Sequence, residues 1–245
     1  MAEGLRTLIV GAGVAGLALA ALLRRDGHRP VVIDQHDPAA DAGYAIALWP
    51  HGSRVFHALG MHDAFVARSA PMRRYVSTNG DGHVLTASPT PDRIAAYGRL
   101  GLLARADLIE ILRDAGQDIP LQSGVTVDAL AAGPDGVDIV LSDGGAEQFD
   151  LVVGADGIGS RVRHCLLGPV PERDTGWGCL VWWTDPGLTP PGQTTERYGT
   201  ASFVGTYPAP IGYASSPECR SMLSAPTAGT GPNDWSATCG TTRWP

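Results

Sequence analysis

The chain lacks lysine entirely, and all 18 of its basic residues are arginines. A Walker-type phosphate loop and catalysis through a Schiff base both require a lysine side chain, so the sequence excludes both kinds of site. Basic residues are also fewer than the 25 acidic ones, which leaves a net charge of −7. We therefore expect neither nucleic acid nor an anionic membrane surface as a partner.

Cysteine is scarce, and its spacing carries no metal signature. The four cysteines are Cys165, Cys179, Cys219 and Cys239. They show no C-x-x-C spacing and no nearby histidine pattern that would complete a set of metal ligands, so we expect no metal site. Free thiols are typical of a reducing compartment, and this favours a cytoplasmic location.

One uncharged run, Leu8 to Leu23, raises the alternative of a signal peptide or a membrane anchor. The run has only 16 residues, and three of them are glycines. Its positive charges, Arg24 and Arg25, follow the apolar run instead of preceding it. Length, glycine content and charge order all argue against both alternatives.

The strongest pattern lies between Thr7 and Asp34, TLIVGAGVAGLALAALLRRDGHRPVVID. A short apolar run enters the glycine-rich turn of residues 11–16, an apolar segment continues to Arg24, and Gly27 precedes a second apolar run. This order predicts a strand, a tight turn, a helix and a second strand. Within those elements, the G-x-G-x-x-G spacing predicts a dinucleotide-binding unit.

Each glycine of this turn has its own physical role. Gly11 permits the sharp turn, Gly13 lets the backbone approach a pyrophosphate, and Gly16 lets the helix pack closely on the sheet. Amides at the helix start then hold the phosphates. Asp34 lies 23 residues after Gly11, where a carboxylate accepts hydrogen bonds from an adenosine ribose and repels a 2′-phosphate. We therefore expect FAD or NAD here. The further residues expected at this site are Val14, Ala15 and Gln35.

Downstream of Asp34 the pattern alternates between sheet and helix. The pattern of residues 35–43 predicts a loop, and that of residues 44–48 predicts a short buried strand. A helix is expected from Pro50 to its end at Gly60. Residues 74–87 predict a hairpin, because positive-φ residues separate two short apolar segments. A hairpin inserted here leaves the parallel sheet, so we expect it to join a second sheet.

A second amphipathic helix is predicted from Leu102 to Gly116, with Arg105 at its start. A cation in the first turn is opposed by the helix dipole, which costs about 0.3–1 kcal/mol unless an anion lies close. Asp107 is one candidate for that anion, and a bound phosphate is the other.

Residues 125–156 predict a β-meander whose last strand, Phe149 to Val153, is unbroken apolar from Leu151 through Val153. Such a run is expected to be buried on both faces and to return to the parallel sheet. Ligands bind at the carboxyl ends of parallel strands. Asp156, just beyond that strand, is therefore expected to face the same crevice as the glycine turn.

Three segments in order resemble the FAD-dependent aromatic-ring hydroxylases, the class A flavoprotein monooxygenases related to para-hydroxybenzoate and salicylate hydroxylases. They are GAGVAG with Asp34, RADLIEIL opened by Arg105, and DLVVGADGIGSRVR with Asp156. The resemblance implies that the glycines bind the FAD pyrophosphate and that Asp34, in place of the usual glutamate, binds the ribose. It also implies that Arg105 contacts the phosphate and ribityl region. Val127 would supply backbone contacts near the adenine, and Asp156 would serve both FAD and NAD(P)H.

The resemblance also implies the fold and the domain organisation. We expect an α/β protein with a Rossmann-like FAD-binding parallel sheet, an inserted β-meander and part of a second, β-rich substrate domain. The FAD-binding domain would span residues 1–170, with 70–103 contributing to the substrate-side sheet, and the partial substrate domain would span 171–214. Strands in the segment 196–210 would line the substrate pocket. The tryptophans expected on the preceding strands are Trp177, Trp182 and Trp183.

Residues 215–245 depart from the family pattern. They contain no Val, Ile or Phe, and 17 of the 31 are Ser, Thr, Gly or Pro. Such a segment cannot bury enough apolar surface to offset its ordering entropy, so we expect it to be disordered. The later Gly-Asp motif that holds the flavin ring in the family has no counterpart here. We therefore expect a chain truncated at its C-terminus.

By resemblance, the expected function is hydroxylation of a phenolic or related small aromatic substrate with FAD, O2 and NADH or NADPH. The cofactor carries that chemistry, so no catalytic side chain is named. The alternative is a nucleotide-binding remnant without turnover, because half of the flavin site is absent. An NAD-dependent dehydrogenase and a flavin-dependent halogenase are disfavoured by the absence of lysine. The substrate and the oligomeric state are left open.

Overall fold

The computed structural model describes residues 4–37, 44–91, 94, 98–171, 173, 177–184, 190–200, 202–209 and 219–226, with only the backbone described for 177–184 and 219–226. The helices are α1 (Val14–Arg25), α2 (Pro50–Ala58), α3 (His62–Arg68), α5 (Arg105–Ala115) and α6 (Arg161–Leu167). None of the helices in these ranges is long and apolar enough to cross a membrane.

A four-stranded parallel sheet forms the centre of the first unit, in the order β12-β1-β2-β8. Its strands are β1 (Arg6–Val10), β2 (Arg29–Asp34), β8 (Leu121–Ser123) and β12 (Leu151–Gly154). β1 lies inside the sheet, and its apolar side chains from Leu8 to Val10 are at most 1% exposed. This confirms the predicted strand–helix–strand unit and the Rossmann-like fold class.

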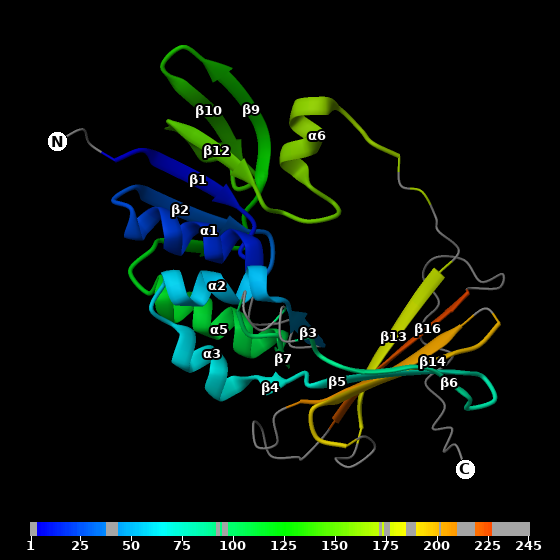
Figure 1. The fold of residues 1–245 in the computed structure, drawn as a ribbon. Coiled ribbons are helices and arrows are strands. Elements are labelled where there is room, and N and C mark those ends of the chain that lie inside the picture. Colours follow the sequence, from blue (N-terminus) through cyan, green and yellow to red (C-terminus); the bar gives the residue numbers. More distant parts are fainter. Residues whose placement is uncertain are drawn as a thin grey trace.

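Two apolar layers cover the faces of this sheet (Figure 1). On one face, α1 and α5 pack against Ile9 and Val32 in a core that also includes Phe56 and Phe65. On the other, the meander and α6 bury Val127 together with other strand residues. The meander strands, joined in antiparallel order, are β9 (Val127–Gly133), β10 (Gly136–Leu141) and β11 (Ala146–Phe149).

Two antiparallel or mixed sheets extend away from this core. The smaller has the order β3-β7-β4, and its strands are β3 (Ala45–Leu48), β4 (Ala70–Pro71) and β7 (Gly101–Ala104). The larger has six strands in the order β13-β16-β15-β14-β5-β6 and lies apart from the parallel sheet in Figure 1. Its strands are β5 (Arg74–Asn79), β6 (Val84–Pro89), β13 (Trp177–Thr184), β14 (Gln193–Tyr198), β15 (Phe203–Tyr207) and β16 (Cys219–Pro226). The predicted hairpin, β5-β6, therefore joins a second sheet as expected.

The helix expected from Leu102 begins later than predicted. Residues Gly101–Ala104 form strand β7, and α5 starts at Arg105. Leu102 and Leu103 are 3% and 0% exposed between β3 and β4. A short apolar run of this kind fits a buried strand as well as a helix, so periodicity alone misplaced the boundary.

The last strand of the meander also differs from its prediction. The predicted strand breaks after Phe149: β11 pairs with β10, and β12 pairs in parallel with β1. The return to the parallel sheet is confirmed, but burial on both faces is wrong, since Leu151 is 43% exposed. β12 is an edge strand of its sheet and has a strand neighbour on one side only.

Within residues 215–245, for which disorder stays a prediction, residues 219–226 form strand β16. This strand lies between β13 and β15 and pairs antiparallel with both. Backbone hydrogen bonding to two neighbours supplies order that the weakly apolar side chains alone do not predict. The described part of the chain does not include the rest of this segment or residues 38–43 of the predicted loop. It also leaves out the side chains of Trp177, Trp182 and Trp183.

Candidate functional site

A crevice of about 220 Å³ opens at the carboxyl ends of β1, β2 and β12. Segments distant in sequence meet there because parallel strands end at one edge of the sheet. Its lining residues are Val10, Gly11, Ala12, Gly13, Asp34, Gln35, His36, Asp37, Arg105, Thr126, Ala155, Asp156, Gly157, Gly159 and Arg161. Of the residues predicted from sequence, this places Gly11, Gly13, Asp34, Gln35, Arg105 and Asp156 together.

The glycine turn is built by close backbone contacts. Gly11 has a φ of +111°, and a Cβ there would lie 2.3 Å from the carbonyl oxygen of Ala155. A Cβ on Gly16 would lie 1.8 Å from the carbonyl oxygen of Gly11, so α1 approaches the turn only because residue 16 lacks a side chain. A Cβ on Gly13 would have no neighbour within 4 Å. Gly13 thus leaves open space where a ligand can approach the backbone.

The start of α1 is not capped by a side chain. Gly13 is the N-cap residue, it offers no side-chain hydrogen bond, and the first turn contains no acidic residue. The first backbone amides of a helix have no partner within the helix. The amides of Val14, Ala15 and Gly16 therefore point their partial positive charge out of the helix start, beside the crevice, where an anionic group is stabilised.

Asp34 ties the glycine turn to the end of β2. One carboxylate oxygen accepts a hydrogen bond from the backbone amide of Ala12 at 2.6 Å, and the other accepts one from the amide of His36 at 2.8 Å. Each carboxylate oxygen has two lone pairs. Asp34 can therefore hold the turn and still accept a hydrogen bond from each of two hydroxyl groups.

Arg105 reaches the crevice from the first residue of α5. Its backbone amide donates to the carbonyl oxygen of Tyr44 at 2.9 Å, and its guanidinium lies 5.9 Å from the centre of the Tyr44 ring. Asp107, the intramolecular anion considered from the sequence, is only 8% exposed. Arg105 also lines the crevice, where a bound phosphate would be a second anion for this helix start.

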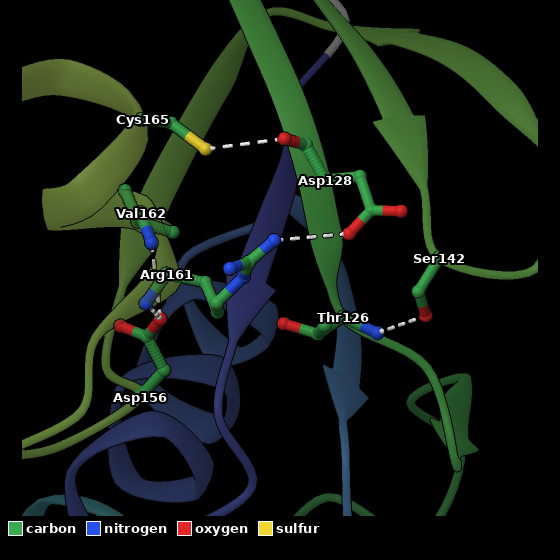
Figure 2. Close-up of polar contacts among 7 residues, drawn as sticks. All are labelled: Thr126, Asp128, Ser142, Asp156, Arg161, Val162 and Cys165. Carbon is green, nitrogen blue, oxygen red and sulfur yellow. Dashed lines mark hydrogen bonds and ion pairs between the residues drawn. The ribbon is translucent and has the colours of Figure 1, made fainter. Parts of the chain in front are cut away.

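Asp156 organises the turn from β12 into α6 (Figure 2). One oxygen accepts from the Ser160 hydroxyl at 2.6 Å, and the other from the amides of Arg161 and Val162 at 2.6 and 3.1 Å. The Ser160 hydroxyl in turn accepts from the amide of Arg163. The carboxylate therefore lines the crevice while it holds the first turn of α6 in place.

Sequence reasoning did not include Arg161 and Thr126 in the site. The Arg161 guanidinium lies 3.1 Å from the Asp128 carboxylate on β9, which joins α6 to the meander (Figure 2). Arg161 follows the Asp-Gly turn closely in sequence, so its place at the site could have been predicted from that spacing. Thr126 has no such signal, because its place depends on how the meander packs on the sheet.

Val127 does not line the crevice. Its side chain is 0% exposed in the core under the meander, and its neighbour Thr126 faces the crevice instead. Contacts from Val127 to an adenine would therefore come from its backbone alone, as the resemblance implied. A larger hollow of about 250 Å³ lies between α1, α5 and β2, but it contains neither the glycine turn nor any of the predicted site residues.

Comparison with known proteins agrees with this geometry. The pattern of the FAD binding domain family matches residues 5–190. The chain is 30% identical over 243 residues to a 3-amino-4-hydroxybenzoate 2-monooxygenase of Streptomyces cremeus, covering 96% of this chain and 61% of that protein. It is 29% identical over 214 residues to an FAD-dependent urate hydroxylase of Klebsiella pneumoniae, covering 85% and 56% respectively.

Solved structures share the fold. The structure of Klebsiella pneumoniae HpxO with FAD and uric acid superposes with a TM-score of 0.80 at 26% identity, covering 93% of this chain and 58% of that one. Pseudomonas aeruginosa PqsL, solved with 2-aminobenzoylacetate, gives a TM-score of 0.78 at 25% identity, covering 91% and 61%. The chain thus spans about 56–61% of the length of each of these proteins.

Proposed function

Because this chain belongs to the FAD binding domain family, we propose that it forms the cofactor-binding part of an FAD-dependent monooxygenase. The proposed reaction uses O2 and NADH or NADPH to hydroxylate a phenolic or similarly electron-rich small molecule. The monooxygenase names of the relatives and the aromatic ligands in the two neighbouring structures support this assignment. The pattern of isolated cysteines supports a reducing, cytoplasmic setting.

The single observation that carries the proposal is that groups from separate segments of the chain meet in one crevice. The open face of Gly13, the Asp34 carboxylate and Arg105 come from three separate segments and line one crevice. These groups fit the adenylate half of FAD. The amides of Val14, Ala15 and Gly16 would hold the pyrophosphate, Asp34 would accept ribose hydroxyls, and Arg105 would neutralise phosphate charge.

FAD, when bound, would supply the redox chemistry of this reaction, which is hydride acceptance from NAD(P)H and activation of O2. The residues of this chain bind and orient it. Asp156 would set the position of the α6 turn against the cofactor, and Arg161, anchored by Asp128, would hold part of the crevice wall in place. Positioning of this kind is the contribution a protein makes when the cofactor carries the reactive atoms.

A second candidate function is binding of FAD or another adenine nucleotide without turnover. The crevice volume of about 220 Å³ favours it, since pockets for drug-sized ligands are typically about 300–1,000 Å³ and FAD is larger than such ligands. The crevice lining described here can therefore hold part of the cofactor only.

Purification followed by visible absorbance separates the two candidates. A yellow protein whose flavin is bleached by NADH or NADPH, and whose consumption of that reductant and of O2 rises when a phenolic substrate is added, supports the monooxygenase. A protein that binds FAD or ADP in calorimetry but shows no substrate-stimulated oxidation supports binding alone. Failure to bind any adenine nucleotide would contradict both.

A further inference from the structure

One carboxylate on the six-stranded sheet is surrounded by three phenols. The Tyr75 and Tyr198 hydroxyls donate to one oxygen of Glu196 at 2.7 and 2.5 Å, and the Tyr207 hydroxyl donates to the other at 2.8 Å. We call these four residues the Glu196 cluster. They come from β5, β14 and β15, three neighbouring strands, so the cluster forms only when the hairpin β5-β6 joins the later strands.

Strand register places the cluster on one face of the sheet. Side chains alternate between faces along a strand, and paired residues share a face. Glu196 pairs with Ser77 on β5 and with Gly205 on β15, so Tyr75 and Tyr207, each two residues away, share its face. A Cβ on Gly205 would lie 2.5 Å from the Tyr207 ring. Glycine at this position therefore lets Tyr207 lie along the strand towards Glu196.

The cluster is accessible, and its sheet is connected along the chain to the small β3-β7-β4 sheet. Tyr198 is 42% exposed, its ring centre is 5.8 Å from that of Phe203, and the other three cluster residues are partly exposed. β5 leaves the small β3-β7-β4 sheet directly (Figure 1), and β7 in that sheet ends at the residue before Arg105. Tyr75 is the second residue of β5. Because β4 pairs with β7, the chain enters both β5 and the helix that begins at Arg105 from the same small sheet.

The hydrogen bonds within the Glu196 cluster determine which of its groups remain available to bind a ligand. A phenol has one proton to donate, and each of the three phenols donates it to Glu196. What remains for a ligand is a set of oxygen lone pairs, aromatic faces and the negative charge of the carboxylate. Such a surface attracts N–H and O–H donors and cations, and it repels carboxylates.

The protonation states of Glu196 and its tyrosines indicate that the cluster binds a ligand and does not exchange protons with it. Burial acts to raise the pKa of Glu196, but the hydrogen bonds from Tyr198, Tyr75 and Tyr207 outweigh it, and the pKa is lowered. The pKa of Tyr75 and that of Tyr207 are raised, chiefly by burial and also by hydrogen bonding to Glu196. At neutral pH the carboxylate is ionised and the phenols are protonated. Neither is poised to take a proton from a substrate.

We propose that the Glu196 cluster is a specificity-determining subsite that selects neutral or cationic aromatic substrates bearing amine or hydroxyl donors and rejects aromatic carboxylates. The inference rests on the proposed function, because it assigns the substrate class of the same enzyme.

Three probes with the same phenol ring test the charge preference: tyramine (cationic), tyrosol (neutral) and 4-hydroxyphenylacetate (anionic). Binding to the FAD-supplemented chain is measured by equilibrium dialysis at about pH 7.5, where Glu196 and the amine are both charged. We expect tyramine to bind at least about tenfold more tightly than 4-hydroxyphenylacetate, with tyrosol between them. The preference should shrink as salt is added, because the pair is partly exposed.

Glu196→Gln should reduce the tyramine to 4-hydroxyphenylacetate ratio to about twofold or less, because the charge is removed while the shape is kept. Glu147→Gln, an exposed acid on β11, is the matched control and should leave the ratio unchanged. Tyr198→Phe keeps the carboxylate and should retain the preference, which separates charge from a loss of structure.

The proposal fails if wild-type protein binds the anion as tightly as tyramine, if tyramine shows no saturable binding, or if Glu196→Gln keeps the wild-type ratio. The salt dependence of the wild-type ratio tests it even if Glu196→Gln does not fold. FAD binding is measured in the same samples. FAD binding without a charge preference overturns this inference alone, whereas loss of FAD binding overturns the proposed function.

Discussion

Gly11 and Gly13 lie in one turn, yet they need to be glycine for different reasons. Gly11 combines a φ of +111° with a backbone contact that leaves no room for a Cβ, whereas the space around Gly13 is open. Gly11→Ala should therefore destabilise the fold by about 2 kcal/mol or more. Gly13→Ala should change stability by less than about 1 kcal/mol but weaken FAD binding at least about tenfold, because the new methyl group occupies the approach to the phosphates.

Urea unfolding and FAD titration of both variants check this contrast. Equal losses of stability in the two variants would contradict the geometry of the turn. Unchanged FAD affinity in Gly13→Ala would place the phosphates elsewhere.

Asp34 is expected to bind ribose and to hold the glycine turn through the amide of Ala12. Asp34→Ala should weaken FAD binding by about 1.5–3 kcal/mol, the scale of hydrogen bonds to a charged acceptor. Asp34→Asn keeps the shape but replaces one oxygen by an amide donor, so it should lose part of that affinity. Calorimetric titration with FAD and with ADP measures both variants, and retained affinity for ADP in Asp34→Ala would show that the ribose lies elsewhere.

At the scale of elements, α6 depends on the carboxylate that precedes it. Asp156→Ala removes the acceptor for the amides of Arg161 and Val162 and should cost about 1.5–3 kcal/mol of unfolding free energy. Ser160→Ala removes only the N-cap hydroxyl and should cost about 1 kcal/mol. Chemical denaturation of the two variants tests this order, and a larger loss in Ser160→Ala than in Asp156→Ala would contradict it.

The six-stranded sheet carries a pH dependence through Glu196. Because its pKa is lower in the folded chain than in the unfolded one, ionised Glu196 stabilises the fold at every pH above the unfolded value, near 4.3. That contribution is lost as the pH falls below this value and through the folded pKa. Thermal unfolding between about pH 3 and 6 should therefore show a steeper acid loss in wild type than in Glu196→Gln. Parallel curves would contradict the lowered pKa.

At the scale of the whole molecule, FAD should stabilise the chain by mass action. Binding to the folded state alone adds about 2.7 kcal/mol when free FAD is 100 times its dissociation constant. The unfolding midpoint should rise with FAD concentration, and ADP should produce a smaller rise because it contacts only the adenylate half. Differential scanning calorimetry measures both, and an FAD-independent midpoint would contradict binding at the crevice.

Each of the two large sheets combines a local strand pairing with long-range ones, and in the parallel sheet β12 pairs with β1 although Leu151 and Thr7 lie far apart in sequence. In the parallel sheet, β1 and β2 are joined by α1 alone. In the six-stranded sheet, β5 pairs in parallel with β14, so Tyr75 and Thr194 become direct neighbours. Closing such long loops before the strands make contact is entropically costly, so we expect the long-range pairings of both sheets to form after the local ones.

Local sequence determined the first unit and the main part of the cofactor site. The glycine spacing, the apolar runs around it and the carboxylate at Asp34 predict the strand–helix–strand unit, because turn chemistry and helix periodicity are local properties. The expectation that Asp156 faces the same crevice as the glycines followed from one topological rule about parallel strands.

Tertiary structure alone decided the remaining features, which are two of the strands and the Glu196 cluster. Whether residues 101–104 form a strand depends on the neighbours β3 and β4, and β16 is ordered through its pairing with β13 and β15. No local pattern reveals that Glu196 accepts hydrogen bonds from tyrosines on two other strands, since those contacts depend on register across the sheet. Periodicity reports which face of an element is apolar, but only packing between distant segments chooses the partner that covers it.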